Sequence, residues 1–345
     1  MEDFWKLISE TKRPVVLYGT GNAAERLVDL LAKRGVRVSG CMASDDFVRE
    51  RSFRNYRVLS FERARQIFGD DMITVLGFGS HDSKVIENIK KIAAECDLYA
   101  PDILTCEDGN VFDSEYYEKH SKDIEWARSL LCDEESKRVF DREIEYRLSA
   151  RIDHLIECES PEGENWKLLN IGPDEAFMDL GAYNGDTIRR FLSFTDTYEH
   201  IYAVEPDRRN YSRLVESTKN LEHCTLFNVG ISDRREERCF AQKKGRGSNA
   251  NNQGDRLIFD SIDNLLCGKR ASILKFDIEG QETKGLLGAE YTIKKYRPKM
   301  VLSAYHRIDD FWALPRIIMK MRDDYRFYMR HSPCIPAWEY DYFLV

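Results

Sequence analysis

The sequence predicts an α/β protein of two α/β domains that are joined by helices. The chain has 345 residues, above the roughly 250–300 residues at which a single hydrophobic core stops growing. Two separate stretches alternate apolar runs, glycine turns and helical spacing, and a charged stretch without strand pattern lies between them. We therefore expect an N-terminal domain over residues 1–112, connecting helices with a linker over 113–165, and a C-terminal domain over 166–345.

The N-terminal domain begins as a strand, a glycine turn and a helix. Val15–Tyr18 is a short apolar run, and leucines recur at helical spacing over 27–31. A further strand is expected at Ile73–Phe78, followed by a helix over 83–95. The linker proper is the polar segment 159–164, which contains Pro and Gly and therefore favours an irregular chain.

The C-terminal domain is expected to hold seven strands. Five of them alternate with helices, and the last two follow each other without an obvious helix between them, a pattern typical of a mostly parallel sheet. The expected strands are Ala176–Leu180, His200–Val204, Cys224–Val229, Ile273–Ile278, Lys299–Ala304, Tyr325–Arg330 and Tyr340–Val345.

Composition disfavours several classes of protein. Asp and Glu number 60 against 52 Lys and Arg, a formal charge of -8, so nucleic acid is not expected as a partner. No apolar run approaches the roughly 18 residues that a membrane span needs, and the N-terminus lacks the basic and apolar regions of a signal peptide. The nine cysteines are scattered without a C-x-x-C pair, which indicates reduced thiols in the cytoplasm and no zinc site.

The first glycine turn, Gly19-x-Gly21-x-x-Ala24, is a variant of the dinucleotide-binding fingerprint. Glycines there allow a tight turn and a close approach of the backbone to a phosphate at the helix N-terminus. The motif also requires an acid about 20 residues later, at the end of the second strand. The match to this requirement is imperfect, because Asp45 and Asp46 lie just beyond that strand. Two interpretations stay open: a bound nucleotide or nucleotide sugar, and a turn that only packs a helix on a strand.

The second glycine turn has a carboxylate, Asp179, at the end of its strand, before Gly181 and Gly185. An anion is unfavourable beside a pyrophosphate but favourable beside S-adenosylmethionine, which carries a sulfonium and an ammonium group. Glu205 closes the next strand, where an acid can accept both ribose hydroxyls, and the segment 228–233 closes the third, where the adenine edge would lie. The expected cofactor-binding residues are Asp179, Gly181, Ala182, Tyr183, Asn184, Gly185, Glu205, Pro206, Ser232, Asp233 and Asp277.

The fourth strand of this domain is unusually charged. A central parallel strand should be nearly all apolar, yet Lys275, Asp277 and Glu279 alternate and would share one side of an extended chain. Burial of three charges is costly unless they pair or meet a ligand. Two interpretations follow: a structural ion cluster, or an active centre at the carboxyl end of the strand, where His306 would follow the next strand.

The stretch from about 177 to 316 resembles the FkbM family of S-adenosylmethionine-dependent methyltransferases. The resemblance implies a class I methyltransferase fold and O-methylation of sugar or natural-product hydroxyls. Tyr183 stands where the widest methyltransferase motif has Gly. The N-terminal domain resembles, more loosely, the Rossmann-like domains found beside sugar-modifying enzymes. The segments that carry the family resemblance are Asp179–Gly185, Glu205–Asp207, Lys275–Glu282, Leu287–Glu290, Arg297–Pro298 and Tyr305–His306.

The favoured function is therefore methyl transfer from S-adenosylmethionine to a hydroxyl of a sugar, glycan or natural product. His306 or Asp277 would be the base that removes the hydroxyl proton. Lys275 would offset the carboxylates or stabilise a developing alkoxide, and Glu279 would orient the acceptor. We assign no metal, because two carboxylates are thin support for a divalent ion. The loop 242–254 is expected to line the acceptor pocket.

Two other functions stay open at this point. The first is a catalytically silent protein with a methyltransferase fold, which binds a nucleotide sugar or assists assembly; the charged fourth strand argues against it. The second is a dehydrogenase that uses the first glycine turn, which the missing acid partner disfavours.

Overall fold

The computed structural model describes residues 2–44, 52–103, 110–161, 163–240 and 255–345. The chain divides into two compact units. The first comprises residues 1–162, 305–308 and 329–340, and the second comprises residues 163–304, 309–328 and 341–345. The loop 242–254 that was expected to line the acceptor pocket lies outside the described residues, as do Asp45 and Asp46.

The first unit is built on a six-stranded mixed sheet in the order β3-β4-β2-β1-β5-β6. Strand β1 pairs in parallel with β2 on one side and with β5 on the other, so the strand order reverses at β1. This confirms the expected α/β fold of the N-terminal part. The strands are β1 (Val15–Tyr18), β2 (Gly40–Met42), β3 (Ser52–Phe53), β4 (Tyr56–Leu59), β5 (Ile73–Leu76) and β6 (Asp97–Tyr99), and the helices around them are α1 (Phe4–Glu10), α2 (Asn22–Lys33), α3 (Phe61–Phe68) and α4 (Ser83–Glu95).

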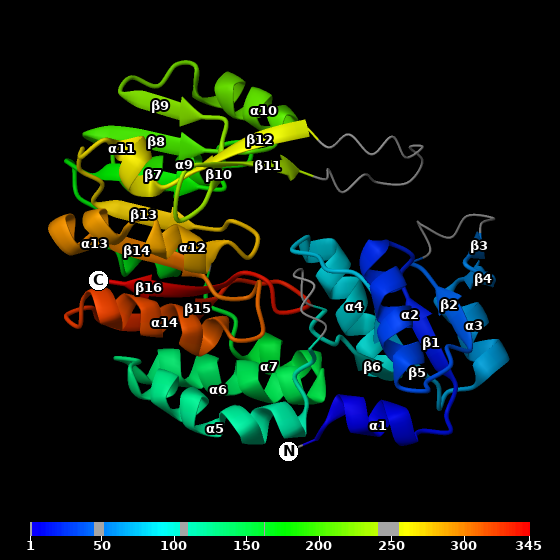
Figure 1. Ribbon diagram of the computed structural model, residues 1–345. Helices are drawn as coiled ribbons and strands as arrows, with labels where there is room; N and C mark the ends of the chain where they lie inside the picture. Colours follow the sequence, from blue (N-terminus) through cyan, green and yellow to red (C-terminus); the bar gives the residue numbers. More distant parts are fainter. Residues whose placement is uncertain (1, 45–51, 104–109, 162, 241–254) are drawn as a thin grey trace. The chain divides into compact units, whose positions relative to one another are not determined.

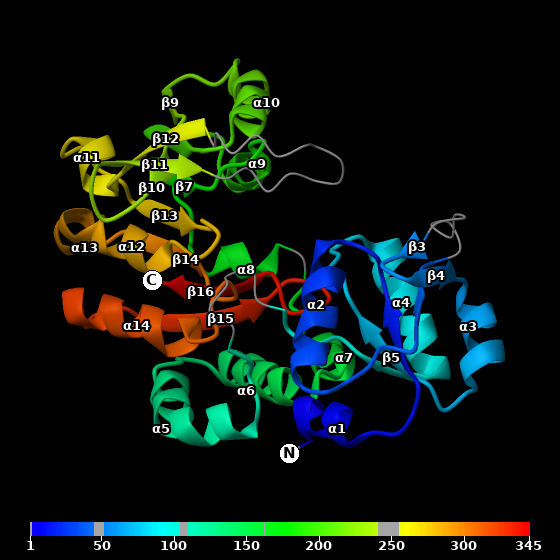
Figure 2. The same ribbon diagram turned by 45° about the vertical axis from the view of Figure 1, so that its right-hand side comes forward.

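Helices cover both faces of this sheet (Figure 2). Val15 and Leu17 pack in one core with residues of α1 and α2, whereas Val16 and Tyr18 pack in a second core with residues of α3 and α4. Successive side chains of a strand point to opposite faces. A strand that is buried on both faces must therefore be apolar throughout, as β1 is.

Three further helices belong to the first unit: α5 (Ser114–Ser129), α6 (Glu134–Ser149) and α7 (Ile152–Glu157). Hydrogen bonds fasten α6 within this unit. The hydroxyl of Tyr146 donates to the carbonyl of Ala100, and that of Tyr340 donates to the carbonyl of Val139. Contacts therefore group most of the expected connecting segment 113–165 with the first unit, and the expected domain boundaries at 112 and 165 stay a prediction.

The second sheet has seven strands in the order β15-β16-β14-β13-β7-β8-β9, which Figure 1 shows side by side. All neighbours from β14 to β9 are parallel, and β16 runs antiparallel to β14. The expected seven-stranded sheet is confirmed, although β13 ends two residues earlier than expected. The strands are β7 (Ala176–Leu180), β8 (His200–Val204), β9 (Cys224–Phe227), β13 (Ile273–Phe276), β14 (Lys299–Ser303), β15 (Phe327–His331) and β16 (Tyr340–Leu344).

Helices also cover the second sheet. Phe177, Ile201 and Ile273 on one face form a core with residues of α8, α9 and α10. On the other face the ring of Phe276 lies against Gly285 of α12. The helices of this unit are α8 (Glu164–Lys167), α9 (Asp186–Leu192), α10 (Arg208–Thr218), α11 (Ile262–Leu266), α12 (Glu282–Leu287), α13 (Glu290–Tyr296) and α14 (Asp310–Met321).

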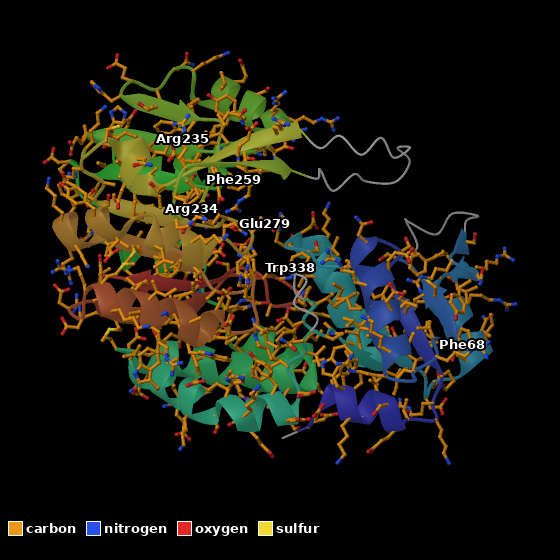
Figure 3. The ribbon with its side chains drawn as sticks, viewed as in Figure 1. Phe68, Arg234, Arg235, Phe259, Glu279 and Trp338 are labelled. Atoms are coloured by element: carbon orange, nitrogen blue, oxygen red, sulfur yellow. The ribbon has the colours of Figure 1, made fainter. Side chains whose placement is uncertain are left out.

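A small sheet that the sequence did not predict follows β9. Its strands are β10 (Gly230–Ile231), β11 (Glu236–Phe240) and β12 (Asp255–Asp260), in the order β10-β12-β11. The ring of Phe259, labelled in Figure 3, covers Gly230 so closely that any Cβ at position 230 would overlap it. Because β11 carries mostly charged residues and lacks an apolar alternation, its sequence did not stand out as a strand.

Candidate active site

The register of β7 and β13 explains the charge in the middle of the second sheet. Lys275 is the cross-strand partner of Asp179 in a parallel pair, so the two side chains lie on one face. The Nζ of Lys275 is 3.5 Å from Asp179 Oδ1 and 3.4 Å from Asp277 Oδ2. It also donates to the carbonyl of Gly181 at 3.4 Å. Three expected site residues thus meet at the carboxyl end of these strands.

Burial sets the electrostatics of this cluster. Asp179 is fully buried, and loss of hydration raises its pKa to about 6, although Lys275 acts in the opposite direction. Burial acts to lower the pKa of Lys275, but the carboxylates of Asp277 and Asp179 outweigh it and the pKa is raised. Lys275 therefore carries its positive charge at neutral pH, and its two acidic neighbours compete for it.

Asp179 retains an unmet capacity to accept hydrogen bonds. Apart from the ion pair with Lys275, neither of its carboxylate oxygens accepts a hydrogen bond from the part of the chain that the structure describes. A buried carboxylate in that condition is costly. A cationic or N–H-donating ligand at this edge would relieve the cost, and the ammonium group of S-adenosylmethionine fits that requirement.

The loop after β7 is held tightly against the loop after β13. The amides of Gly181 and Ala182 both donate to the carbonyl of Val204, at 3.0 Å each. A Cβ at Gly181, whose φ is +87°, would overlap the carbonyl of Asp277. Gly185, with φ +81°, is the N-cap of α9. Only glycine combines this backbone conformation with so close an approach of two chains.

Glu205 organises the next loop along the edge. Its side chain is buried (6% exposed), its Oε2 accepts the amide of Tyr183 at 2.9 Å, and its Oε1 accepts the amide of Asp207 at 2.8 Å. Burial raises the pKa of Glu205, and these two backbone hydrogen bonds oppose the rise. Both oxygens keep a second lone pair, so the carboxylate can accept hydrogen bonds from the two hydroxyls of a ribose.

Asn228 is a residue of this edge that the list of expected cofactor residues omitted. Its Nδ2 donates to the carbonyl of Glu205 at 2.8 Å and to that of Pro206 at 3.2 Å. It therefore holds the loop that contains Glu205. Its place one residue after Phe227, the last residue of β9, was the signal in the sequence.

Ser232 and Asp233 lie elsewhere than at the end of the third strand. They follow β10, and they lie against Gly288 just after α12, where a Cβ would overlap the carbonyl of Ser232. The Ser232 hydroxyl donates to Glu236 Oε1 at 2.8 Å and accepts from Arg238 at 2.9 Å. The chain departs from the edge of the sheet after Asn228, so the proposed part of these two residues in cofactor binding stays a prediction.

The expected alternation of three charges on one strand is wrong. Strand β13 ends at Phe276, and Asp277 already lies in the loop. Glu279 has φ +54°, which turns the chain away from an extended path, and its side chain is exposed (Figure 3). The amide of Ile278 donates to Glu282 Oε1 at 2.9 Å, and this bond turns the loop into α12. Lys275 and Asp277 remain together, whereas Glu279 stands at the surface.

His306 follows β14 by three residues and is almost fully buried (1% exposed). Its ring lies 4.2 Å from that of Tyr305, centroid to centroid. Residues 305–308 belong to the first unit, whereas Asp277 belongs to the second. The expectation that His306 and Asp277 serve one reaction therefore stays a prediction.

The glycine turn of the first unit is filled in part by its own chain. Gly19 has φ +117°, and a Cβ there would lie 2.6 Å from the ring of Phe78. Gly21 caps helix α2 without a side-chain hydrogen bond. This geometry suits a turn that packs a helix on a strand, and the expectation of a nucleotide or nucleotide sugar at this turn stays a prediction.

Two further searches concern the described ranges only. No group of three or more His, Cys, Asp or Glu side chains in them could hold a metal ion. None of the helices there is long and apolar enough to cross a membrane.

Comparison with known proteins identifies related sequences and folds. Residues 179–331 match the methyltransferase FkbM domain. The 2-O-methyltransferase NoeI of Sinorhizobium fredii (strain NBRC 101917 / NGR234) is 35% identical over 75 residues, which are 22% of this chain and 30% of that protein. The crystal structure of methyltransferase FkbM from Methylobacillus flagellatus KT superposes with a TM-score of 0.77 at 18% identity, over 99% of this chain and 92% of that one.

These matches differ in what they support. The solved structure shows a shared fold over nearly the whole chain, the first unit included. The chain covers less than a third of NoeI, so the 2-O-methylation in that protein's name bears on this chain only as a guide to a proposal.

Proposed function

Residues 179–331 form a methyltransferase domain of the FkbM family, and from that premise we propose that the chain methylates a hydroxyl of a sugar, glycan or natural product. The chain is an S-adenosylmethionine-dependent methyltransferase by its family. Which acceptor it takes, and which side chains bind and react, are parts of the proposal.

The observation that carries the proposal is the line of groups along the carboxyl edge of β7, β8 and β13. The buried carboxylate of Asp179 stands at one end, the loop from Gly181 to Gly185 in the middle and Glu205 at the other end. We assign the ammonium end of S-adenosylmethionine to Asp179 and the ribose to Glu205. The bound donor would supply an activated methyl group on its sulfonium.

The chain's own residues would position the acceptor and take its proton. During transfer the bond from sulfur to the methyl carbon breaks, the bond from the acceptor oxygen forms, and the sulfur keeps the electron pair. The hydroxyl proton passes to a base, for which Asp277 and His306 are the candidates. Lys275, 3.4 Å from Asp277, would hold the Asp277 carboxylate in position to accept a hydrogen bond from the acceptor hydroxyl.

A sugar is the favoured acceptor. The name of NoeI specifies 2-O-methylation, and the family resemblance also implies sugar or natural-product hydroxyls. We place the protein in the cytoplasm, because free thiols are expected in a reducing compartment. The cysteines that the structure shows as free thiols are Cys41, Cys96, Cys132, Cys158, Cys224, Cys267 and Cys334.

The proposal is tested in two steps. Titration calorimetry of the purified protein with S-adenosylmethionine and with S-adenosylhomocysteine should give saturable binding of both. Incubation with methyl-labelled donor and a panel of neutral sugars, glycosides and glycan fragments should then transfer label to oxygen. Mass spectrometry should show one labelled methyl group in place of a hydroxyl hydrogen of the product.

A protein that binds neither compound would refute the cofactor assignment. Transfer to nitrogen or carbon alone would refute the hydroxyl acceptor.

A further inference from the structure

Tyr183 combines a strained backbone with an exposed ring. Its φ is +45°, in the left-handed region that side chains with a Cβ seldom adopt. Eight other non-glycine residues of the described ranges share that conformation. Three of them stand at helix C-termini, where it is common, and the others are Arg54, Asn170, His223, Glu279 and Glu339. Tyr183 differs from all of these in that it places an aromatic ring in the glycine loop between β7 and α9.

The strain at Tyr183 brings no visible gain in packing. The side chain is 44% exposed, and its ring makes no ring-to-ring contact or hydrogen bond with another residue of the described ranges. A glycine would adopt this backbone at lower cost. A bulky aromatic residue held in such a conformation, at a site rather than at a helix end, indicates a function of the side chain.

The position of Tyr183 along the loop indicates which part of the donor its ring serves. Its amide is bound to Glu205, the residue assigned to the ribose, at 2.9 Å. Two residues earlier, the carbonyl of Gly181 accepts a hydrogen bond from Lys275. Lys275 also pairs with Asp179, the residue assigned to the ammonium end. The sulfonium of S-adenosylmethionine lies between its ribose and its amino-acid end, and residue 183 lies between the two protein groups.

We propose that the ring of Tyr183 is a donor-specificity element that contacts the sulfonium of S-adenosylmethionine by a cation–π interaction. This inference rests on the proposed function. An aromatic face attracts a cation more strongly than the neutral thioether of S-adenosylhomocysteine, because the thioether carries no charge to interact with the ring quadrupole. The ring would therefore favour the charged donor over the spent product, and it would contribute to release of the product after transfer.

The experiment compares dissociation constants for the two ligands by titration calorimetry, in the wild-type protein and in Tyr183→Leu and Tyr183→Phe. Leucine keeps an apolar side chain of moderate size but removes the aromatic face. We expect Tyr183→Leu to weaken binding of S-adenosylmethionine by roughly fivefold to tenfold, and binding of S-adenosylhomocysteine by less than about twofold. Tyr183→Phe should behave as wild type toward both.

Two controls separate this role from a structural one. Tyr291→Leu removes a tyrosine of similar exposure, 49%, on α13, and should change neither constant. Tyr183→Gly should melt at or above the wild-type temperature, because the left-handed backbone suits glycine, yet it should lose the preference for S-adenosylmethionine.

The outcomes are distinct. Loss of the preference in the Leu and Gly variants, with the Phe variant intact, supports the proposal. Equal weakening of both ligands, or no change, overturns it and leaves the proposed function standing. A wild-type protein that binds neither ligand overturns the proposed function itself.

Discussion

Replacement of Glu205 by Gln tests the cofactor site most directly, because the structure shows what each carboxylate oxygen does. Oε2 accepts the amide of Tyr183 and Oε1 accepts the amide of Asp207. The amide side chain of Gln has one acceptor oxygen and one NH₂ group. One of the two backbone N–H groups, that of Tyr183 or that of Asp207, would therefore face the NH₂ group of Gln and lose its acceptor. Water reaches this buried place poorly.

The magnitude follows from these two bonds. A hydrogen bond to a charged acceptor contributes about 1.5–3 kcal/mol, and a buried donor without a partner costs a similar amount. We expect Glu205→Gln to lower the free energy of unfolding by about 2 kcal/mol. The ribose would lose an ionised acceptor at the same time, so affinity for S-adenosylhomocysteine should fall at least tenfold, or about 1.4 kcal/mol.

The assay pairs urea unfolding with titration calorimetry of S-adenosylhomocysteine at a temperature where the variant is fully folded. Glu216→Gln is the matched control, because the Glu216 side chain is 72% exposed on α10 and pairs with Lys219 at the surface. The control should leave both quantities unchanged. Unchanged affinity in folded Glu205→Gln would refute the assignment of the ribose to Glu205.

Four further results are expected. Lys275→Met should lower the free energy of unfolding at neutral pH by about 3 kcal/mol in urea titrations, because the Asp179 carboxylate loses its buried partner. Asp277→Asn should change the free energy of unfolding by less than about 1 kcal/mol, because Asp277 is partly exposed and Lys275 retains its ion pair with Asp179. Methyl transfer by this variant should fall by roughly a hundredfold if Asp277 is the base. The pKa of Asp179 is raised to about 6 from an unfolded value of 3.8. Its protonation therefore stabilises the unliganded fold as pH falls from about 6 to about 4, while affinity for the cationic donor decreases. Asp179→Asn should abolish both pH dependences, as measured by scanning calorimetry for stability and by titration calorimetry for affinity. A fragment of residues 166–345 should show no cooperative melt, because the amide of Met329 and the side chain of Arg330 bind Ser136, which the fragment lacks.

The local features of the fold could be predicted from the sequence. β1, β7 and β8 have the bounds that their apolar runs predict, and α4 spans 83–95 as its spacing predicts. Such strands are buried on both faces, so their composition alone marks them. The glycines of the second turn and the acids at the ends of two strands could also be recognised in the sequence. A tight turn and a carboxylate at a strand end each depend on only a few adjacent residues.

The features that the sequence did not predict depend on contacts between distant residues. The ion pair of Lys275 with Asp179 follows from the register of two strands about a hundred residues apart in the chain, and periodicity within one strand does not reveal it. The position of Glu279 at the surface depends on a left-handed turn that Glu282 stabilises through the amide of Ile278. The displacement of Ser232 depends on β10, a strand of two residues that exists because β12 pairs with it. Residue types along the chain therefore determined which groups were available for chemistry, whereas strand pairing and loop packing determined which of them meet, since burial and register are properties of the assembled sheet.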